Sequence, residues 1–401
     1  MSNMNSLKNN RTGGDHTSLK VLVGGMLGMV VAMGIGRFAF TPILPLMQRD
    51  LGLSNSSAGW LAATNYLGYL IGATLCSLAP QVLRSRTITG MALITSIATT
   101  LCMGLTLSTF WWEVMRLGGG IASAILFIII SSEVAETLSQ RGHSQWFGAL
   151  YSGIGLGIAL SGLMVPWFDR QGGWATAWLG SGCLAIVAAW TGLALGRQRA
   201  GLQFDAPVTT KPCNHQQNLR PLVIAYFLEG LGYIVTATFI VAIIARTPGI
   251  ANFAPYSWVA VGLAAAPSTL LWPLWAKRVG NKTVLLTAFC LQAAGILISS
   301  KADSLLAVLF SAVSFGATFL GIVAVTLAEG IRRWPADSRQ ATAILTTSFS
   351  LGQIIGPAVA GVLADRQSDF TLPLLLASAC VMSGGVIILL DRHFVGLQPK
   401  R

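Results

Sequence analysis

The chain is 401 residues long, and 53% of its residues are hydrophobic while only 10% are charged, which gives a mean hydropathy of +0.66. Soluble proteins carry about 25% charged residues, so this composition excludes a water-soluble globular protein and indicates one that crosses a membrane many times. The net charge of +12 is carried by lysines and arginines scattered singly over polar segments, which argues against nucleic-acid binding.

Twelve apolar runs are each long enough to cross a bilayer as a helix, which takes about 20 residues. None shows the apolar and polar alternation of a barrel strand, so we expect an all-α membrane protein. We expect the first run to be retained rather than cleaved as a signal peptide, because it is too long and contains Arg37 and Pro42. The runs are 21–47, 56–79, 87–107, 110–132, 146–166, 173–195, 221–244, 257–275, 282–300, 304–328, 341–364 and 371–390.

The first run carries an arginine, Arg37, near its centre. A guanidinium at the centre of a membrane helix costs about 2.5 to 3.5 kcal/mol, so it needs a partner or a water-filled cavity and marks a functional site. We therefore place Arg37 in a substrate site, together with its neighbours Phe40 and Thr41. The alternative is that Arg37 extends outward to water or braces a neighbouring helix.

Polar groups on the second, fourth and fifth runs form less distinctive patterns. Asn65 and Tyr69 lie four residues apart on the second run, and Tyr151 begins the glycine-rich face of the fifth. Such groups either join helices or bind the solute, and we place Tyr151 in the substrate site. Glu113 and Arg116 lie three residues apart on the fourth run, and we expect them to pair with each other or with the backbone of the fifth run.

The seventh run has a polar face that includes the acid closest to the centre of any run. Its members, at spacings of three and four residues, are Tyr226, Glu229, Tyr233 and Thr236. A carboxylate at membrane depth is costly unless it is neutral or paired, so we expect Glu229 to bind a coupling proton and the other three residues to bind substrate. The alternative is that Glu229 is a structural centre of hydrogen bonds between helices.

The eleventh run combines polar residues with glycines that repeat the spacing of the fifth run. Thr346, Ser350, Gln353 and Pro357 share one of its faces, and we place Gln353 in the substrate site. Glycines let helices approach closely, and Gly356-Pro357 allows bending, so we expect structural or gating roles for the glycines and Pro357. The glycines are Gly120 of the fourth run, Gly153, Gly157 and Gly162 of the fifth, and Gly352, Gly356 and Gly361 of the eleventh.

The longest polar stretch, 196–220, divides the runs into six and six. We therefore expect an N-terminal half at 1–195, a cytoplasmic linker at 196–220 and a C-terminal half at 221–401, arranged as two parallel repeats. Most of the 26 lysines and arginines lie in segments on the side of both termini, which predicts cytoplasmic termini in a bacterial inner membrane.

Sequence patterns for nucleotide, metal and catalytic sites are lacking. No GxxxxGK[ST] loop is present, so the energy for transport is expected from an ion gradient or from the gradient of the solute itself. The six cysteines show no CxxC spacing, and the four histidines lie in four different segments outside the runs. We therefore expect no metal site, no cofactor and no enzymatic activity.

The chain resembles the major facilitator superfamily of secondary transporters over nearly its whole length. The segment from Arg116 to Gly120 fits that family's RxxxG pattern, and the glycines of the fifth and eleventh runs are similar to its bending helices. Residues 274–282 lie where the family has a basic gating loop, which implies gating roles for Lys277, Arg278 and Gly280, although Lys277 replaces the usual aspartate. More narrowly, the segments 34–45, 226–233 and 352–357 are similar to the YbfB/YjiJ branch.

These observations predict a monomeric transporter that lies in lipid and binds a small molecule midway through the bilayer, between its two halves. We expect it to be coupled to protons and to work by alternating access. Export of drug-like compounds or metabolites is favoured over the alternative, which is uptake of a small organic anion or solute. A non-transporting membrane sensor is a more distant alternative, because no loop is long enough to hold a signalling module.

Overall fold

The computed structural model describes residues 2–79, 85–196, 217–301 and 304–394. In these ranges the regular structure is entirely helical, and eleven helices are long and apolar enough to cross a membrane. The predicted all-α membrane fold is therefore confirmed. Large apolar side chains such as Trp190 and Leu306 are 77% and 80% exposed, as expected where the outer surface faces lipid.

The helices of the N-terminal half begin with a first span built from three pieces. These are α1 (Ser2–Met29), a π-helical segment η1 (Val30–Ile35) and α2 (Phe40–Leu51). They are followed by α3 (Asn55–Leu78), α4 (Arg86–Met103), α5 (Thr109–Gln140), a short 3₁₀ segment η3 (Ser144–Tyr151) and α6 (Ser152–Gly196). The run 21–47 predicts one continuous helix, and the structure interrupts it between η1 and α2.

The longest helix, α6, crosses the membrane twice. It has 45 residues and is broken at Gly172 and Gly173, and Gly173 has a φ of +72°, in the left-handed region that favours glycine. Gly153 near its start lies against Met26 of α1, and Gly192 near its end lies against Gly24 of the same helix. The chain therefore reverses within α6, so each of the twelve predicted runs corresponds to a helical crossing.

The C-terminal half contains six helices of similar length. They are α7 (Arg220–Ala245), α8 (Ala254–Val279), α9 (Asn281–Ser299), α10 (Leu305–Arg333), α11 (Ser338–Gln367) and α12 (Thr371–Leu390). Short 3₁₀ segments, η5 (Ala251–Phe253) and η6 (Pro335–Asp337), precede α8 and α11.

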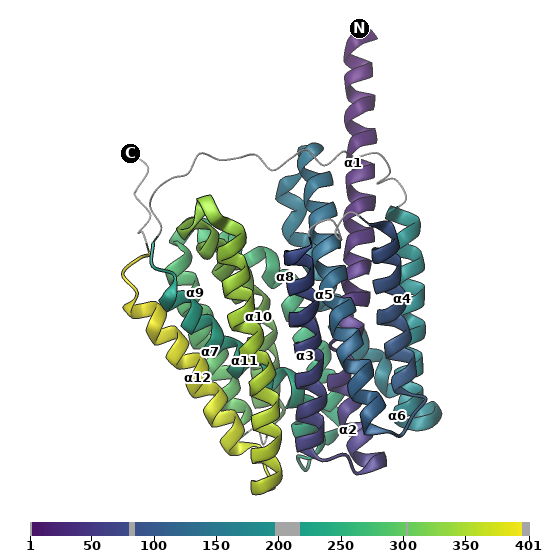
Figure 1. Ribbon diagram of the computed structural model, residues 1–401, viewed down its shortest axis with the longest axis vertical. Helices are drawn as coiled ribbons and strands as arrows, with labels where there is room; N and C mark the ends of the chain where they lie inside the picture. The colour runs from purple at the N-terminus through teal and green to yellow at the C-terminus, as the bar shows by residue number, and fades with distance from the viewer. Residues whose placement is uncertain (1, 80–84, 197–216, 302–303, 395–401) are drawn as a thin grey trace.

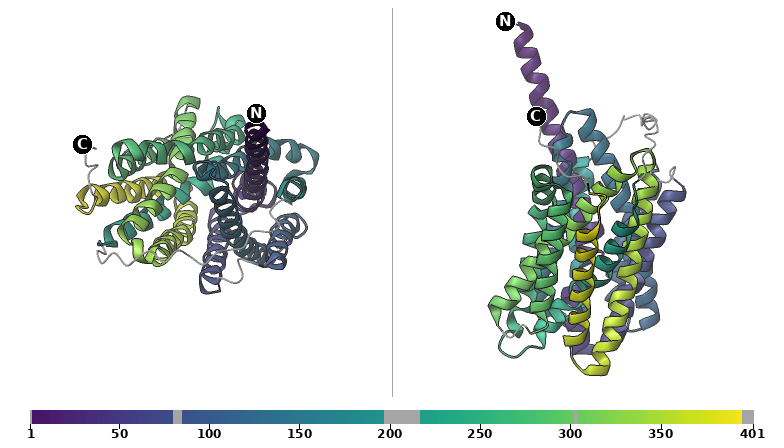
Figure 2. Two further views of the ribbon diagram at one scale, coloured as in Figure 1. Left: turned by 90° about the horizontal axis from the view of Figure 1, so that it is seen from above. Right: turned by 90° about the vertical axis from the view of Figure 1, so that its left-hand side faces the viewer.

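The helices before residue 197 and those after residue 216 form two groups that lie side by side (Figure 1 and Figure 2). The groups meet where α3 packs against α11, where α6 packs against α8 and where α2 contacts α7. The N-terminal end of α1 and the C-terminal end of α12 lie on the same side (Figure 1). The linker predicted at 196–220 falls largely outside the described residues.

Candidate functional site

Arg37 lies at the break in the first span, between η1 and α2. The N–H groups of Gly36 and Phe38 donate to carbonyls five residues earlier, those of Val31 at 2.9 Å and Met33 at 3.1 Å. Local π-helical geometry of this kind is rare and is frequently found at functional sites. The break therefore places the guanidinium on irregular backbone inside the bundle.

Three of the predicted substrate residues join the two halves. Arg37 is only 3% exposed, and its Nη2 donates to Oε1 of Gln353 on α11 at 3.0 Å. Gln353 in turn donates through Nε2 to the hydroxyl of Tyr233 on α7. We refer to these residues as the Arg37–Gln353–Tyr233 chain. It links the N-terminal half to two helices of the C-terminal half.

The positive charge of Arg37 has aromatic neighbours instead of a counter-ion. The guanidinium carbon lies 4.5 Å from the ring centre of Tyr66 and 4.4 Å from that of Tyr69, both on α3. Its Nε is buried and has no hydrogen-bond partner, and the described part of the chain provides no ion pair to this arginine. The side chain does not extend outward to water, and it does brace α3 and α11.

A group of nearly parallel rings surrounds Tyr233. Its ring lies 5.2 Å from that of Phe349, at an angle of 11°. Phe315 and Phe319 lie 6.2 and 6.1 Å from Tyr233, at 15° and 9°. Tyr226 extends the group, because it stacks on Phe349 at 4.3 Å. We call these five rings, contributed by α7, α10 and α11, the aromatic wall.

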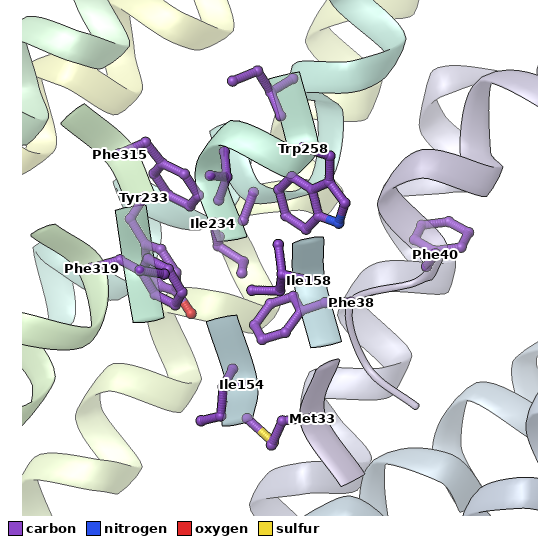
Figure 3. Close-up of a cluster of buried hydrophobic side chains, with 14 of the residues drawn as sticks. Met33, Phe38, Phe40, Ile154, Ile158, Tyr233, Ile234, Trp258, Phe315 and Phe319 are labelled. Carbon is purple, nitrogen blue, oxygen red and sulfur yellow. The ribbon is translucent and has the colours of Figure 1, made fainter. Parts of the chain in front are cut away.

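Phe38 faces the aromatic wall from the N-terminal half. Its ring lies 6.3 Å from that of Phe319 and 6.3 Å from that of Trp258 on α8. Figure 3 shows Phe38 beside Ile158 and near Trp258, with Tyr233, Phe315 and Phe319 grouped together on the opposite side. Trp258 and the phenylalanines of α10 were not predicted from the sequence. The spacing of four residues between Phe315 and Phe319 was the available signal.

The remaining predicted substrate residues lie around this centre. Thr41 donates to the carbonyl of Ala237 at 2.7 Å and so connects α2 to α7. Tyr151 donates to Ser131 at 3.3 Å and stacks on Phe127, whose ring lies 6.5 Å from that of Tyr69.

Two predicted residues face other parts of the bundle. The ring of Phe40 lies under the Arg116 guanidinium, at 4.6 Å, within the N-terminal half. Thr236 is fully buried, and its hydroxyl lacks a partner. It lines a small pocket with Val308 and Ser311, between α7 and α10.

Glu229 lies outside the Arg37–Gln353–Tyr233 chain. It is 1% exposed, and its Oε1 accepts a hydrogen bond from Nε2 of Gln292 on α9 at 2.7 Å. Its Oε2 is buried and has no partner. The carboxyl group therefore faces the interior of the C-terminal half, one helical turn before Tyr233 on α7. Gln292 was not identified from the sequence, because a single glutamine in an apolar run carries no distinctive pattern.

Arg116 has a different partner from the one expected. Its Nε donates to the carbonyl of Leu61 on α3 at 3.1 Å, and Asn65 donates to the carbonyl of Arg116 at 2.9 Å. The expected pairing with Glu113 or with the fifth run is therefore corrected to a bond with α3. Gly120 lies directly against the backbone of Asn65, so α3 and α5 approach closely here and bring the carbonyl within reach.

The predicted structural glycines lie at two kinds of contact. Gly153 and Gly157 face the first span and Gly352 and Gly356 face α7, all within their own halves. Gly162 instead lies against α8 of the other half. The carbonyl of Pro357 likewise lies against Gly59 of α3, across the two halves.

The ion pairs near the predicted gating loop come from helix ends. Lys277 and Arg278 are exposed at the end of α8, and Gly280, with a φ of +88°, joins α8 to α9. Arg333 on α10 is fully buried between two carboxylates, at 2.9 Å from Glu329 and 2.8 Å from Asp391.

The helix that follows the loop adds a hydrogen bond to this cluster. Asn281, the first residue of α9, donates to Glu329 at 2.9 Å. Burial raises the pKa of the Asp391 carboxyl, but the hydrogen bond from the His393 backbone and the ion pair with Arg333 hold it below its ordinary value. The spacing of Glu329 and Arg333, four residues apart on one helix, was the signal available in the sequence.

Comparison with known proteins places these features in context. A family model described as the uncharacterised MFS-type transporter YbfB matches residues 29–389. The uncharacterized transporter YycB of Bacillus subtilis (strain 168) is 25% identical over 367 residues, which cover 86% of this chain and 86% of that protein.

Solved structures share the same fold. The nucleoside transporter NupG aligns with a TM-score of 0.70 at 14% identity, covering 93% of this chain and 98% of that one. A bacterial homologue of the human lysosomal transporter Spinster, in an inward-facing and occupied conformation, aligns with a TM-score of 0.71 at 14% identity, covering 95% and 98%.

Proposed function

Because the chain belongs to the YbfB-type family of major facilitator superfamily transporters, we propose that it carries a small solute with an anionic group, bound at Arg37 between the two halves. The family predicted from the sequence is confirmed, and so is its class as a membrane transporter. The nature of the solute, the coupling ion and the direction of transport belong to the proposal.

The observation that carries the proposal is a buried guanidinium without a counter-ion at the contact between the halves. Leaving a buried charge unpaired costs several kcal/mol, so the site favours a ligand that supplies the opposite charge. The planar fork of an arginine matches a carboxylate or phosphate group with two parallel hydrogen bonds. An anionic group of the solute would replace the amide oxygen of Gln353 at Arg37.

Such an exchange couples binding to movement of the halves. When the solute takes the place of Gln353, the hydrogen bond from Arg37 to α11 is lost, and the Gln353–Tyr233 pair is free to move with the C-terminal half. Another polar contact joins the halves away from Arg37, where Asp365 accepts from the N–H groups of Asn55 at 3.0 Å and Ser56 at 2.7 Å. Rocking that breaks and remakes such contacts is the motion expected of alternating access.

Glu229 supports coupling to protons. Its carboxyl group is buried, has one oxygen without a partner among the described residues and accepts from the neutral amide of Gln292, so no cation neutralises its charge when it is ionised. It lies one turn from Tyr233, so a change of charge on Glu229 acts on the helix that holds one end of the Arg37–Gln353–Tyr233 chain. Proton release would then be linked to the arrangement of the two halves.

The positive charge of Arg37 limits the class of solute that we expect the site to bind. A cationic drug would be repelled by Arg37, so among exported compounds the site favours anionic metabolites. We place export of such metabolites slightly ahead of uptake of a small organic anion, and either direction uses the same site.

The proposal is tested by thermal unfolding of the purified protein in the presence of small carboxylates and phosphates, each beside its neutral amide or alcohol. We expect anionic compounds alone to raise the unfolding temperature, because only they supply the missing charge. The effect should vanish in Arg37→Gln and persist in Arg170→Gln, a change at an exposed arginine of the same half. Neutral ligands that stabilise both variants equally would contradict the proposal.

A further inference from the structure

We propose that the solute bound at Arg37 is a planar aromatic monocarboxylate. This inference rests on the proposed function, because it requires an anionic solute at Arg37, and it specifies the rest of the molecule from the surfaces around the guanidinium.

The rings of the aromatic wall lie nearly parallel to one another. Phe315 and Phe319 lie 5.2 Å apart at 7°, and both are within 15° of the Tyr233 plane. Ring pairs elsewhere among the described residues have larger angles, from 27° for Phe127 and Tyr151 to 80° for Trp112 and Trp174. Parallel rings favour a flat ring stacked in the same orientation over a puckered or branched group.

The aromatic wall is connected to the charge through a single side chain. Tyr233 belongs to both, because its ring is part of the aromatic wall and its hydroxyl is bonded to Gln353, the partner of Arg37. A carboxylate on Arg37 therefore directs the group attached to it toward the wall. A ring joined directly to the carboxylate fits this arrangement with no flexible spacer, which lowers the entropic cost of binding.

The surface of the N-terminal half that faces the aromatic wall is also aromatic. Phe38 lies 6.3 Å from Phe319 at an angle of 73°, so the two halves meet edge to face (Figure 3). The guanidinium of the preceding residue, Arg37, lies 5.7 Å from the Phe38 ring centre. When the halves move apart, a planar solute can enter between Phe38 and the wall. When they close again, it stacks on the wall and contacts Phe38 edge to face.

Two buried hydrogen-bond donors near the wall lack acceptors among the described residues. Arg37 Nε and the indole N–H of Trp258 are both buried and have no partner in the structure. Trp258 is fully buried and its ring contacts Phe38, so its free donor belongs to the same centre. A ring hydroxyl on the solute offers an acceptor to Trp258, so the class extends to hydroxylated benzoates.

The buried arginines of this half provide for one carboxylate on the solute. The other buried arginine of this half, Arg116, already donates to the carbonyl of Leu61 and lies over Phe40. Only Arg37 keeps a buried donor without a partner among these two arginines. A second carboxylate on the solute would have no unpaired buried arginine donor to bind.

Binding measurements on the purified protein test this inference with three probes. Benzoate has the ring and the charge, cyclohexanecarboxylate has the charge on a puckered ring, and benzamide has the ring without the charge. We expect benzoate to bind roughly tenfold more tightly than cyclohexanecarboxylate, as stacking on several rings predicts. Benzamide should bind far more weakly than either anion.

Variants of the wall separate stacking from simple apolar contact. Phe319→Leu keeps an apolar side chain and should remove most of the preference for benzoate. Phe239→Leu is the matched control, because Phe239 is a fully buried ring on α7 that packs against Phe370 and not against the wall. If Phe319→Leu fails to fold, Trp258→Phe provides the second test, since it should weaken binding of 4-hydroxybenzoate and leave that of benzoate unchanged.

The outcomes distinguish this inference from the function on which it rests. Equal binding of benzoate and cyclohexanecarboxylate, both lost in Arg37→Gln, would overturn the aromatic class and leave the anion site in place. Binding of an aliphatic anion without binding of benzoate would likewise overturn the aromatic class and leave the anion site in place. Benzamide binding as tightly as benzoate, and surviving Arg37→Gln, would overturn both.

Discussion

Two buried arginines show how the surroundings of a charge separate structure from function. Arg333 has two carboxylates within 2.9 Å, so its charge is neutralised inside the protein. Arg37 has only ring faces and an amide oxygen, which are weaker than an ion pair. The first arrangement is complete without a ligand, whereas the second becomes complete when an anion binds.

Replacing Arg333 is expected to destabilise the fold. Arg333→Gln leaves Asp391 buried without its arginine and leaves Glu329 paired with Arg332, which costs about 3 to 5 kcal/mol. Thermal unfolding should show a large loss for Arg333→Gln and a small change for Arg37→Gln. Because the pKa of Asp391 is held below its ordinary value, its contribution is present above that value and is lost as the pH falls through the lowered pKa. Equal stability of Arg333→Gln and the wild type would contradict this assignment.

Glu229→Gln is expected to separate solute exchange from proton coupling. The glutamine copies the protonated carboxyl group with little change in shape, so solute binding and exchange across the membrane should remain. Accumulation driven by a pH gradient should be lost, because the proton can no longer be released. Reconstituted vesicles provide the measurement, with Asp369→Asn in an exposed loop as the control. Intact gradient-driven uptake in Glu229→Gln would leave only the structural role with Gln292.

At the scale of helices, α6 shows how one element serves two contacts. Gly157 lies against Gly34 of the first span, within the N-terminal half, and Gly162 lies against Val259 of α8, across the halves. In the proposed rocking motion, contacts inside a half would persist, whereas those between the halves would change. The same substitution should therefore have different effects at the two positions.

Gly157→Ala and Gly162→Ala test this difference. A Cβ at residue 157 would lie 2.7 Å from the Gly34 backbone, and such overpacking costs about 1 to 3 kcal/mol of stability. A Cβ at residue 162 would lie 2.8 Å from the backbone nitrogen of Val259, and the halves can relieve it by separating. We expect a lower unfolding temperature only for Gly157→Ala, and an altered transport rate at normal stability for Gly162→Ala. Equal destabilisation by both would indicate that α6 and α8 do not separate.

The predictability of these elements follows from the forces that form them. The membrane requires long apolar helices, so hydropathy located the crossings, and the cost of burying a guanidinium singled out Arg37. Gln353 and Tyr233 were candidates on separate helices, but their bonding to Arg37 depends on how α7 and α11 pack. The π-helical break and the three phenylalanines of the aromatic wall were missed, because phenylalanines in an apolar run look the same whether they face lipid or a binding site.

For the whole molecule, the distribution of charge predicts the orientation in the membrane. Reporters fused after Gln398 and within 203–218 should read as cytoplasmic, and one within 169–172 should read as external, because positively charged segments stay on the cytoplasmic side. The break in α6 at Gly173 places the last of these fusions at a turn between two crossings. A reversed pattern would overturn the orientation.

The proposed function depends on Arg37 contacting the transported anion. The most direct measurement is transport into vesicles of the anion that most stabilises the purified protein, by the wild type, Arg37→Lys and Arg37→Ala. Lysine keeps the charge but lacks the planar fork, so we expect Arg37→Lys to lose transport nearly as fully as Arg37→Ala, by about tenfold or more. Normal transport by well-expressed Arg37→Ala would contradict the account, because the charge would then have no part in binding the solute.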